Sequence, residues 1–280
     1  MWTLVKIEWV KTFRRRRTYI GFATIGFFLP LFFIAMKLSG GAFLQHSSAM
    51  KAIQENFVIM GNIFNGMFVS RIIMNTLFVH IPLLIVLVPG DIVAGEAAAG
   101  TLRTILTRPP SRLKVIASKI ILSLIYTALL LIFMALLSLI VGYLLFGLGY
   151  LVVLKDGILI FTVREALVRF AFAYALAIVA MGVIAAVAFL LSVQVSNAIG
   201  PIIGSIMIVV IFLIITATPL SAFDHIRPFL FTTYTNVWEL AFADPIPWET
   251  IVTHVGVLVL YMAGLFGLSA YIFQRKDILS

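Results

Sequence analysis

The chain alternates long apolar runs with short polar stretches. Six of the runs approach or exceed the roughly 20 residues that cross a bilayer as a helix. They are Tyr19–Met36, Ile72–Pro89, Ile120–Phe146, Ala166–Ser192, Ala198–Thr218 and Ile251–Phe273. Because the runs are apolar on every face, they do not fit the short alternating strands of a transmembrane barrel. The pattern predicts an all-α polytopic membrane protein with six transmembrane helices.

The first 17 residues have a different pattern. Apolar residues recur every three or four positions, and charged residues occupy another face. The apolar set is Trp2, Val5, Trp9 and Phe13, and the charged set is Glu8, Lys11 and Arg15. We expect residues 1–17 to form an amphipathic helix that lies in the head-group plane.

Three stretches between the spans carry their own signals. The loop Lys37–Ser70 is too mixed in composition for a span and favours a short helix over Ala49–Met60. Leu151–Leu154 and Ile158–Thr162 flank an Asp-Gly pair, a pattern typical of a β-hairpin. Residues 219–248 are aromatic but contain charges that are costly in hydrocarbon, so we expect short outer helices there and no seventh span.

Composition agrees with a membrane protein. The chain is 62% hydrophobic and 11% charged, against roughly 45–50% apolar residues in soluble domains. Nothing separates it into parts, so we expect one membrane domain over residues 1–280. The sequence has 0 cysteines, which excludes disulfides, thiolate metal sites and cysteine nucleophiles.

The basic residues predict the orientation, because an excess of Lys and Arg marks cytoplasmic loops. Placing both termini in the cytoplasm puts 13 of the 20 basic residues inside, together with Glu8, Asp91, Glu96 and Asp277. These 13 are Lys6, Lys11, Arg14, Arg15, Arg16, Arg17, Arg103, Arg108, Arg112, Lys114, Lys119, Arg275 and Lys276. The formal charge of +9 then lies entirely on one face. We therefore interpret Arg14–Arg17 as a contact with anionic lipid and expect no nucleic-acid partner.

The longest charged stretch between two spans is the loop 91–118. The second span is expected to end at Pro89-Gly90, and Ala94–Thr107 favours a helix that Pro109-Pro110 would end. Leu102, Ile105 and Leu106 share one face of that helix. Such a face is suited to a groove on a soluble partner.

The residues of this loop also form a motif. Glu96 is followed by Gly100-Thr101-Leu102, Ile105-Leu106, Pro109, Arg112 and Lys119. The pattern resembles the cytoplasmic loop of permease subunits in the ABC type II exporter family, and the C-terminal phrase Phe273–Asp277 is similar as well. The resemblance implies a coupling helix that inserts into a separately encoded ATPase subunit. Its coupling surface would comprise Glu96, Gly100, Thr101, Leu102, Arg103, Ile105, Leu106 and Arg112.

The resemblance also implies an assembly. Two permease chains, identical or paralogous, would work with two ATPase subunits that bind ATP and magnesium, in the cytoplasmic membrane of a prokaryote. Membrane lipid would surround them, and an accessory subunit can be part of such a complex.

The sequence offers little chemistry of its own. No lysine follows a glycine, so the chain has no phosphate-binding P-loop, and acids are absent from the span centres. HExxH and GxSxG motifs are absent, and the four histidines lie far apart. We expect no catalytic residue, metal site or cofactor in this chain, so energy would come from a partner.

A few residues within the spans are candidates for a translocation path. His80 is the only ionisable side chain near a span centre, and a neutral, hydrogen-bonded state is favoured over a proton relay. By analogy with the family, spans two and five would line the path, which makes Asn75, Phe78 and Ser205 candidates. Such an apolar path favours a hydrophobic or amphiphilic cargo, and Arg71 is expected to reach the outer boundary.

Small residues repeat at four-residue spacing on two spans. Gly200 and Gly204 lie on the fifth span, and Gly182 and Ala186 on the fourth. Such pairs form close helix contacts within one chain or at a dimer seam.

An exporter permease subunit is the function we expect. A channel or secondary transporter that needs no partner is the alternative, and a membrane enzyme is a third reading. An ATPase gene beside this one would favour the first.

Overall fold

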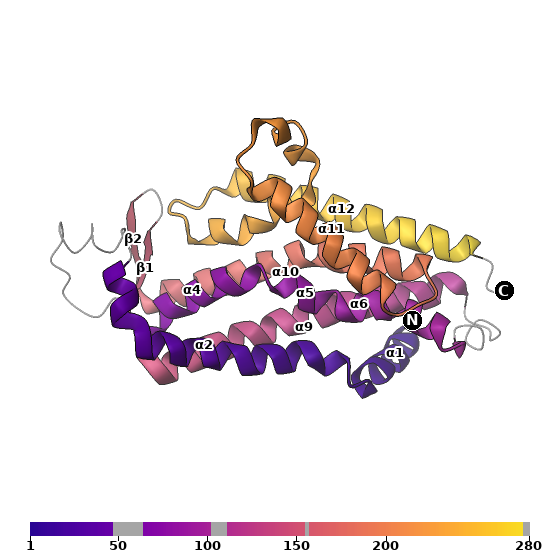
Figure 1. Cartoon of the computed structure of the whole chain (residues 1–280), viewed down its shortest axis with the longest axis horizontal. Coiled ribbons are helices and arrows are strands. Elements are labelled where there is room, and N and C mark those ends of the chain that lie inside the picture. Colours follow the sequence, from indigo (N-terminus) through magenta and orange to yellow (C-terminus); the bar gives the residue numbers. More distant parts are fainter. Residues whose placement is uncertain (47–63, 102–110, 155–156, 277–280) are drawn as a thin grey trace.

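The computed structural model describes residues 1–46, 64–101, 111–154 and 157–276, with the backbone alone for 40–46. The helix expected over Ala49–Met60 lies outside the described residues. Most helices follow one long axis, and both termini lie at the same end of it, opposite a β-hairpin (Figure 1). We call these two ends of the molecule the terminal end and the hairpin end.

Among the described residues, five helices are long and apolar enough to cross a membrane. They are α2 (Thr18–His46), α9 (Arg112–Phe146), α10 (Val163–Gln194), α11 (Gly200–Ala217) and α12 (Trp248–Arg275). Five of the six predicted runs lie within or close to these helices, and α9 begins eight residues earlier than predicted, at Arg112. The predicted end of the first span at Met36 is wrong, because α2 continues to His46 through the first residues of the predicted loop Lys37–Ser70. The chain is thus a helical, multi-pass membrane protein. The long helix α10 lies in the middle of the bundle and is mostly buried (Figure 1).

The remaining run, Ile72–Pro89, is a bent pair of helical segments rather than one straight helix. It comprises α4 (Gly66–Phe78), α5 (Ile81–Ile85) and α6 (Leu87–Asp91), with a 63° bend between α4 and α5. Pro82 has no N–H to donate to the Phe78 carbonyl four residues back. Instead, His80 N donates to Leu77 O and Leu83 N to His80 O, three residues apart. The count is six spans if the bent pair crosses as one.

The bent pair also ends later than predicted. The sequence favours an end at Pro89-Gly90, but α6 continues to Asp91. Pro89 is the third residue of α6, and a helix needs no N–H donors in its first turn. The next helix, α7 (Ala94–Ala98), is shorter than the predicted Ala94–Thr107, because Gly100 has a φ of +68° and interrupts it.

The predicted hairpin is confirmed at the hairpin end. β1 (Leu151–Leu154) pairs antiparallel with β2 (Ile158–Phe161), and Leu151 lies opposite Phe161. Thr162 belongs to the next helix and not to the strand, because its hydroxyl accepts a hydrogen bond from Glu165 N and caps α10.

The outer segment forms short 3₁₀ helices and, over residues 219–248, no further long helix. These are η1 (Ser221–Phe223), η2 (Arg227–Phe229) and η3 (Phe231–Phe242). Several aromatic side chains of η3 point inward: Trp238 is 2% exposed and its ring lies 5.0 Å from that of Phe78. The segment η3 therefore packs against α10 and α12 and closes one side of the bundle.

Two of the small residues make contacts inside the chain. A methyl group on Gly182 would lie 2.8 Å from Met262 Sδ on α12, and one on Gly204 would lie 3.2 Å from Leu191 on α10. These two glycines therefore serve close helix packing within one chain.

Candidate functional site

The polar face of the first helix is turned inward. In α1 (Trp2–Arg14), the buried residues are Val5, Glu8 and Thr12, whereas Trp2 is 77% exposed. The predicted apolar face is therefore divided: Val5 packs against the bundle together with Glu8, whereas Trp2 and Trp9 are exposed. Glu8 is turned inward because it has a charged partner, Lys119, on α9.

Four charged residues at the terminal end form a closed set of ion pairs, which we call the ion ring. Lys119 Nζ lies 2.7 Å from Glu8 Oε2 and 2.7 Å from Glu96 Oε2. Lys11 Nζ lies 3.0 Å from Glu8 Oε1 and 3.2 Å from Glu96 Oε1. Two carboxylates and two ammonium groups thus alternate, and the ring is neutral. It joins α1, α7 and α9.

Lys119 is the most deeply buried member of this ring. Its side chain is 0% exposed, and its ammonium group also donates to Ile92 O at 3.3 Å. Ions so deeply buried are stable only when their partners are close and hydrogen-bonded. Lys119 meets this requirement through its hydrogen bonds to Glu8 Oε2 and Ile92 O, whereas its 2.7 Å contact with Glu96 Oε2 is an ion pair without hydrogen-bond geometry.

The charges in the ring change each other's proton affinity. Burial by itself would raise the pKa of Glu8, but the ammonium groups of Lys119 and Lys11 hold that pKa below its ordinary value of 4.5. Burial opposes the charge on Lys11 too, yet the carboxylates of Glu8 and Glu96 raise its pKa above 10.5. Both groups are therefore charged at neutral pH.

A second set of ion pairs holds the end of α6. Asp91 is bound by Arg15 at 3.0 Å and by Arg17 at 3.4 Å. A Cβ on Gly95 would collide with the Asp91 carboxylate, so only glycine leaves room for it there. The end of the bent span is thus attached to Arg15 and Arg17, which also line a pocket here together with Arg16.

Hydrogen bonds to backbone groups complete the terminal end. Ser192 Oγ, near the end of α10, accepts hydrogen bonds from Val93 N at 3.2 Å and Ala94 N at 2.9 Å, where α7 begins. Lys276 Nζ donates to Val193 O and Gln194 O at the end of α10. Burial lowers the pKa of Lys276. The loop after the bent span is therefore fixed to α10 as well as to α1 and α9.

The predicted coupling residues do not form one described surface. Leu102, Arg103, Ile105 and Leu106 lie outside the described residues. Glu96 is 3% exposed and belongs to the ion ring, so its side chain is not on the surface. Thr101 Oγ1 donates to Glu96 O at 3.3 Å, next to Gly100. Arg112 donates to Gln274 O and Lys276 O, both at 3.1 Å, and so ties α9 to the end of α12.

The three candidate path residues are not brought together. Asn75 is exposed, Phe78 is packed against Trp238, and Ser205 is buried and donates to Pro201 O within its own helix. The guanidinium of Arg71 lies over the ring of Phe242 on η3, 4.9 Å from its centroid. The described residues contain no group of three or more His, Asp or Glu side chains that could hold a metal ion.

The sequence contains a faint signal for the ion ring. Glu8 is the only acid in the basic segment before the first span, and Lys119 is the last charge before a long apolar run. Charges in such places need partners, but Glu8 and Lys119, which pair with each other, lie 111 residues apart along the chain.

Comparison with known proteins gives a family and no assigned function. No curated protein matches the sequence significantly. A protein-family profile described as "Protein of unknown function (DUF2705)" matches residues 31–279, which include the bent span, α7 and the three ring and coupling residues Glu96, Arg112 and Lys119. The chain belongs to the DUF2705 family.

Proposed function

We propose that the chain is the membrane-spanning permease subunit of an ABC exporter. A separate ATPase subunit would bind ATP and magnesium and dock on the loop 91–118. Two permease chains, identical or paralogous, would form the path for a hydrophobic or amphiphilic cargo. The proposal rests first on the loop motif from Glu96 to Lys119 described above.

The ion ring is the structural observation that supports the proposal best. A loop that only connected two spans could remain at the surface, where ion pairs contribute little to stability. It would need no buried ion pairs. Here Glu96, five residues before Thr101, is held to α1 and α9 by short ion pairs. Ser192 holds the same segment to α10. A force on the loop would therefore reach three helices at once.

The distribution of charge supports a specific orientation. The arginines of Arg14–Arg17 and the ion ring lie at the terminal end, where Lys276 and Arg112 also lie. We place this end in the cytoplasm, at the inner face of a prokaryotic cell membrane. The loop 91–118 would then face the compartment that contains ATP.

A pull-down from detergent tests the proposal. The tagged chain is expressed from its native gene neighbourhood and compared with Leu102→Arg plus Leu106→Arg. We expect an ATPase to co-purify with wild type and to be lost in the double variant, because arginines would abolish an apolar docking face. The matched control is Leu148→Arg plus Leu220→Arg, two exposed leucines far from this loop in the sequence.

The outcome distinguishes the two functional classes. Loss of the ATPase in the loop variant alone supports the coupling role. If no ATPase co-purifies and the purified chain moves solutes unaided, the exporter proposal is wrong and a partner-independent channel or secondary transporter takes its place.

A further inference from the structure

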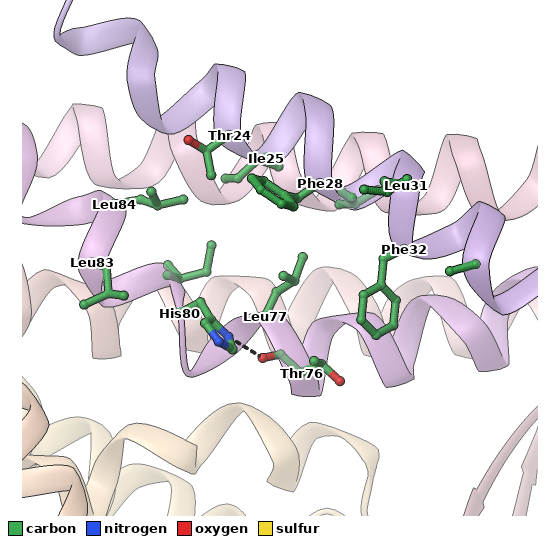
Figure 2. Close-up of a pocket in the computed structure, with 13 residues that line it drawn as sticks. Thr24, Ile25, Phe28, Leu31, Phe32, Thr76, Leu77, His80, Leu83 and Leu84 are labelled. Carbon is green, nitrogen blue, oxygen red and sulfur yellow. Dashed lines mark hydrogen bonds between the residues drawn. The ribbon is translucent and has the colours of Figure 1, made fainter. Parts of the chain in front are cut away.

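A cavity of about 590 Å³ lies between α2 and the bent span (Figure 2). This volume is within the roughly 300–1,000 Å³ of small-molecule binding sites. Its lining side chains are apolar except for Thr24, Thr76 and His80. The cavity exists because the bend turns α5 away from the line of α4, so that no continuous helix fills the space beside α2.

The cavity lies near the middle of both spans that form it. On α2 its lining extends from Thr24 to Ala35, within the membrane-length segment Thr18–Ser39. On the bent pair it extends from Thr76 to Leu84, within Gly66–Asp91. In a bilayer this is the hydrocarbon depth, where polar molecules are costly. An occupant at this depth must be mainly apolar.

One side of the cavity is closed and the other is open. Ile25, Leu29 and Ile81 form a buried inner wall. Phe28 and Leu31 are 55% and 49% exposed, on the outward side of α2. The open side therefore faces the surface that lipid covers, which gives an apolar molecule a route in from the membrane.

His80 supplies the site's specific polar atom. Its Nδ1 lies 3.0 Å from Thr76 O, shown by the dashed line in Figure 2. Because a carbonyl only accepts, Nδ1 carries the hydrogen and Nε2 of the neutral ring is an acceptor. This Nε2 has no hydrogen-bond partner among the described residues. A polar side chain within a span is by default a candidate for function.

We propose that the cavity binds an alkyl chain that carries a hydroxyl group, which enters from the membrane and donates to His80 Nε2. A phospholipid acyl chain offers only methylene groups at this depth, so it fills the volume but leaves His80 without a donor. The site thus discriminates a hydroxyl-bearing amphiphile from ordinary lipid. This inference rests on the proposed function, in which such a molecule is the cargo.

The test uses two photoreactive probes in phospholipid nanodiscs containing the full chain. One is a long-chain alkanol with a diazirine, and the other is the alkane of equal length with the same diazirine. We expect saturable labelling of α2 and of the residues around His80 by the alkanol. Its half-saturation concentration should be about two- to tenfold lower than that of the alkane, the value of one hydrogen bond.

Two tryptophan variants separate the cavity from the rest of α2. Ala35 is exposed and lines the cavity, so Ala35→Trp should fill its mouth and remove the saturable labelling. Ala23 is exposed on the same helix but does not line the cavity, so Ala23→Trp should label like wild type. Undiminished labelling of Ala35→Trp would overturn the proposal.

A histidine series tests the hydrogen bond. His80→Leu should bind both probes equally, and His80→Gln, which keeps an acceptor, should restore the preference for the alkanol. If wild type binds the two probes equally, the cavity holds an ordinary apolar chain and the proposal is wrong. The labelling needs no ATPase, so failure of this site and failure of the exporter assignment are separate results.

Discussion

Replacing Lys119 by Met should destabilise the protein strongly. Lys119 is 0% exposed and lies 2.7 Å from both Glu8 and Glu96. Methionine keeps the length of the side chain and removes its charge. The two carboxylates would then share Lys11 alone, whose side chain is 35% exposed.

The magnitude follows from the loss of a buried partner. Removing one member of a buried ion pair leaves an uncompensated charge and costs about 3–5 kcal/mol. We therefore expect Lys119→Met to lower the free energy of unfolding by about that amount. The folded-to-unfolded ratio would fall by roughly 100- to 4,000-fold. Equilibrium unfolding in mixed micelles with a denaturing detergent measures it.

Two further variants show whether the ion ring is the cause. Lys114 lies on the same helix and is exposed, so Lys114→Met should stay within about 0.5 kcal/mol of wild type. Glu8→Gln combined with Lys119→Met removes one charge of each sign and leaves Lys11 paired with Glu96. The double variant should recover about 0.5–3 kcal/mol relative to the sum of the single effects. Our reasoning would be refuted by a Lys119→Met effect as small as that of Lys114→Met.

Three other predictions concern the same end of the molecule. The folded-state pKa of Glu8 is held below 4.5, so its contribution to stability is full above that value and is lost as the pH falls through the lower folded pKa. Glu8→Gln should therefore reduce the fall in melting temperature that wild type shows between about pH 7 and about pH 3. Ser192→Ala leaves two buried N–H groups at the start of α7 without an acceptor and should lower the unfolding free energy by about 1–3 kcal/mol, whereas an unchanged value would show that another acceptor replaces the hydroxyl. Gly95→Ala should displace the Asp91 carboxylate and reduce stability by about 1–3 kcal/mol, an effect that a double variant with Asp91→Ala would largely cancel if the collision is the cause.

The spans could be predicted from the sequence because hydropathy is a local property. A run of some 20 apolar residues must leave water whatever its neighbours are, so α2 and α9 to α12 follow from their own composition. The hairpin is local too, because in the sequence an Asp-Gly pair lies between two β-prone runs, and these runs form β1 and β2. These elements did not depend on contacts with distant parts of the chain.

The bend of the second span is not predictable from proline alone. Pro30 lies inside the continuous helix α2, whereas Pro82 is the second residue of α5, which follows a 63° bend. A missing N–H permits a break, but packing decides whether the helix breaks or continues. In the bent pair, Phe78 is fixed against Trp238 while α5 and α6 pack against α10 and α11.

The ion ring was missed for a related reason. Periodicity indicates which residues of α1 share a face, but it does not say which face meets the bundle. Lys119 on α9 gives Glu8 a buried partner, so the face with the acid turns inward and Trp2 stays exposed. The pairing depends on contacts far apart in sequence, as does the capping of α7 by Ser192.

One short stretch of backbone joins the ion pairs at the terminal end to the cavity. His80 and Asp91 are separated only by α5 and α6, in which Val86 N donates to Pro82 O and Gly90 N to Val86 O. We therefore expect a shift of Asp91 relative to Arg15 and Arg17 to move His80 relative to α2 as well, because the two short helices form one side of the bend. In the exporter that we propose, an ATPase pressing on the loop acts on the cavity through this stretch. Lys119→Met, which frees Glu96 from α9, should then weaken ATP-dependent transport while alkanol labelling persists; loss of both together would show that the variant merely unfolds the bundle.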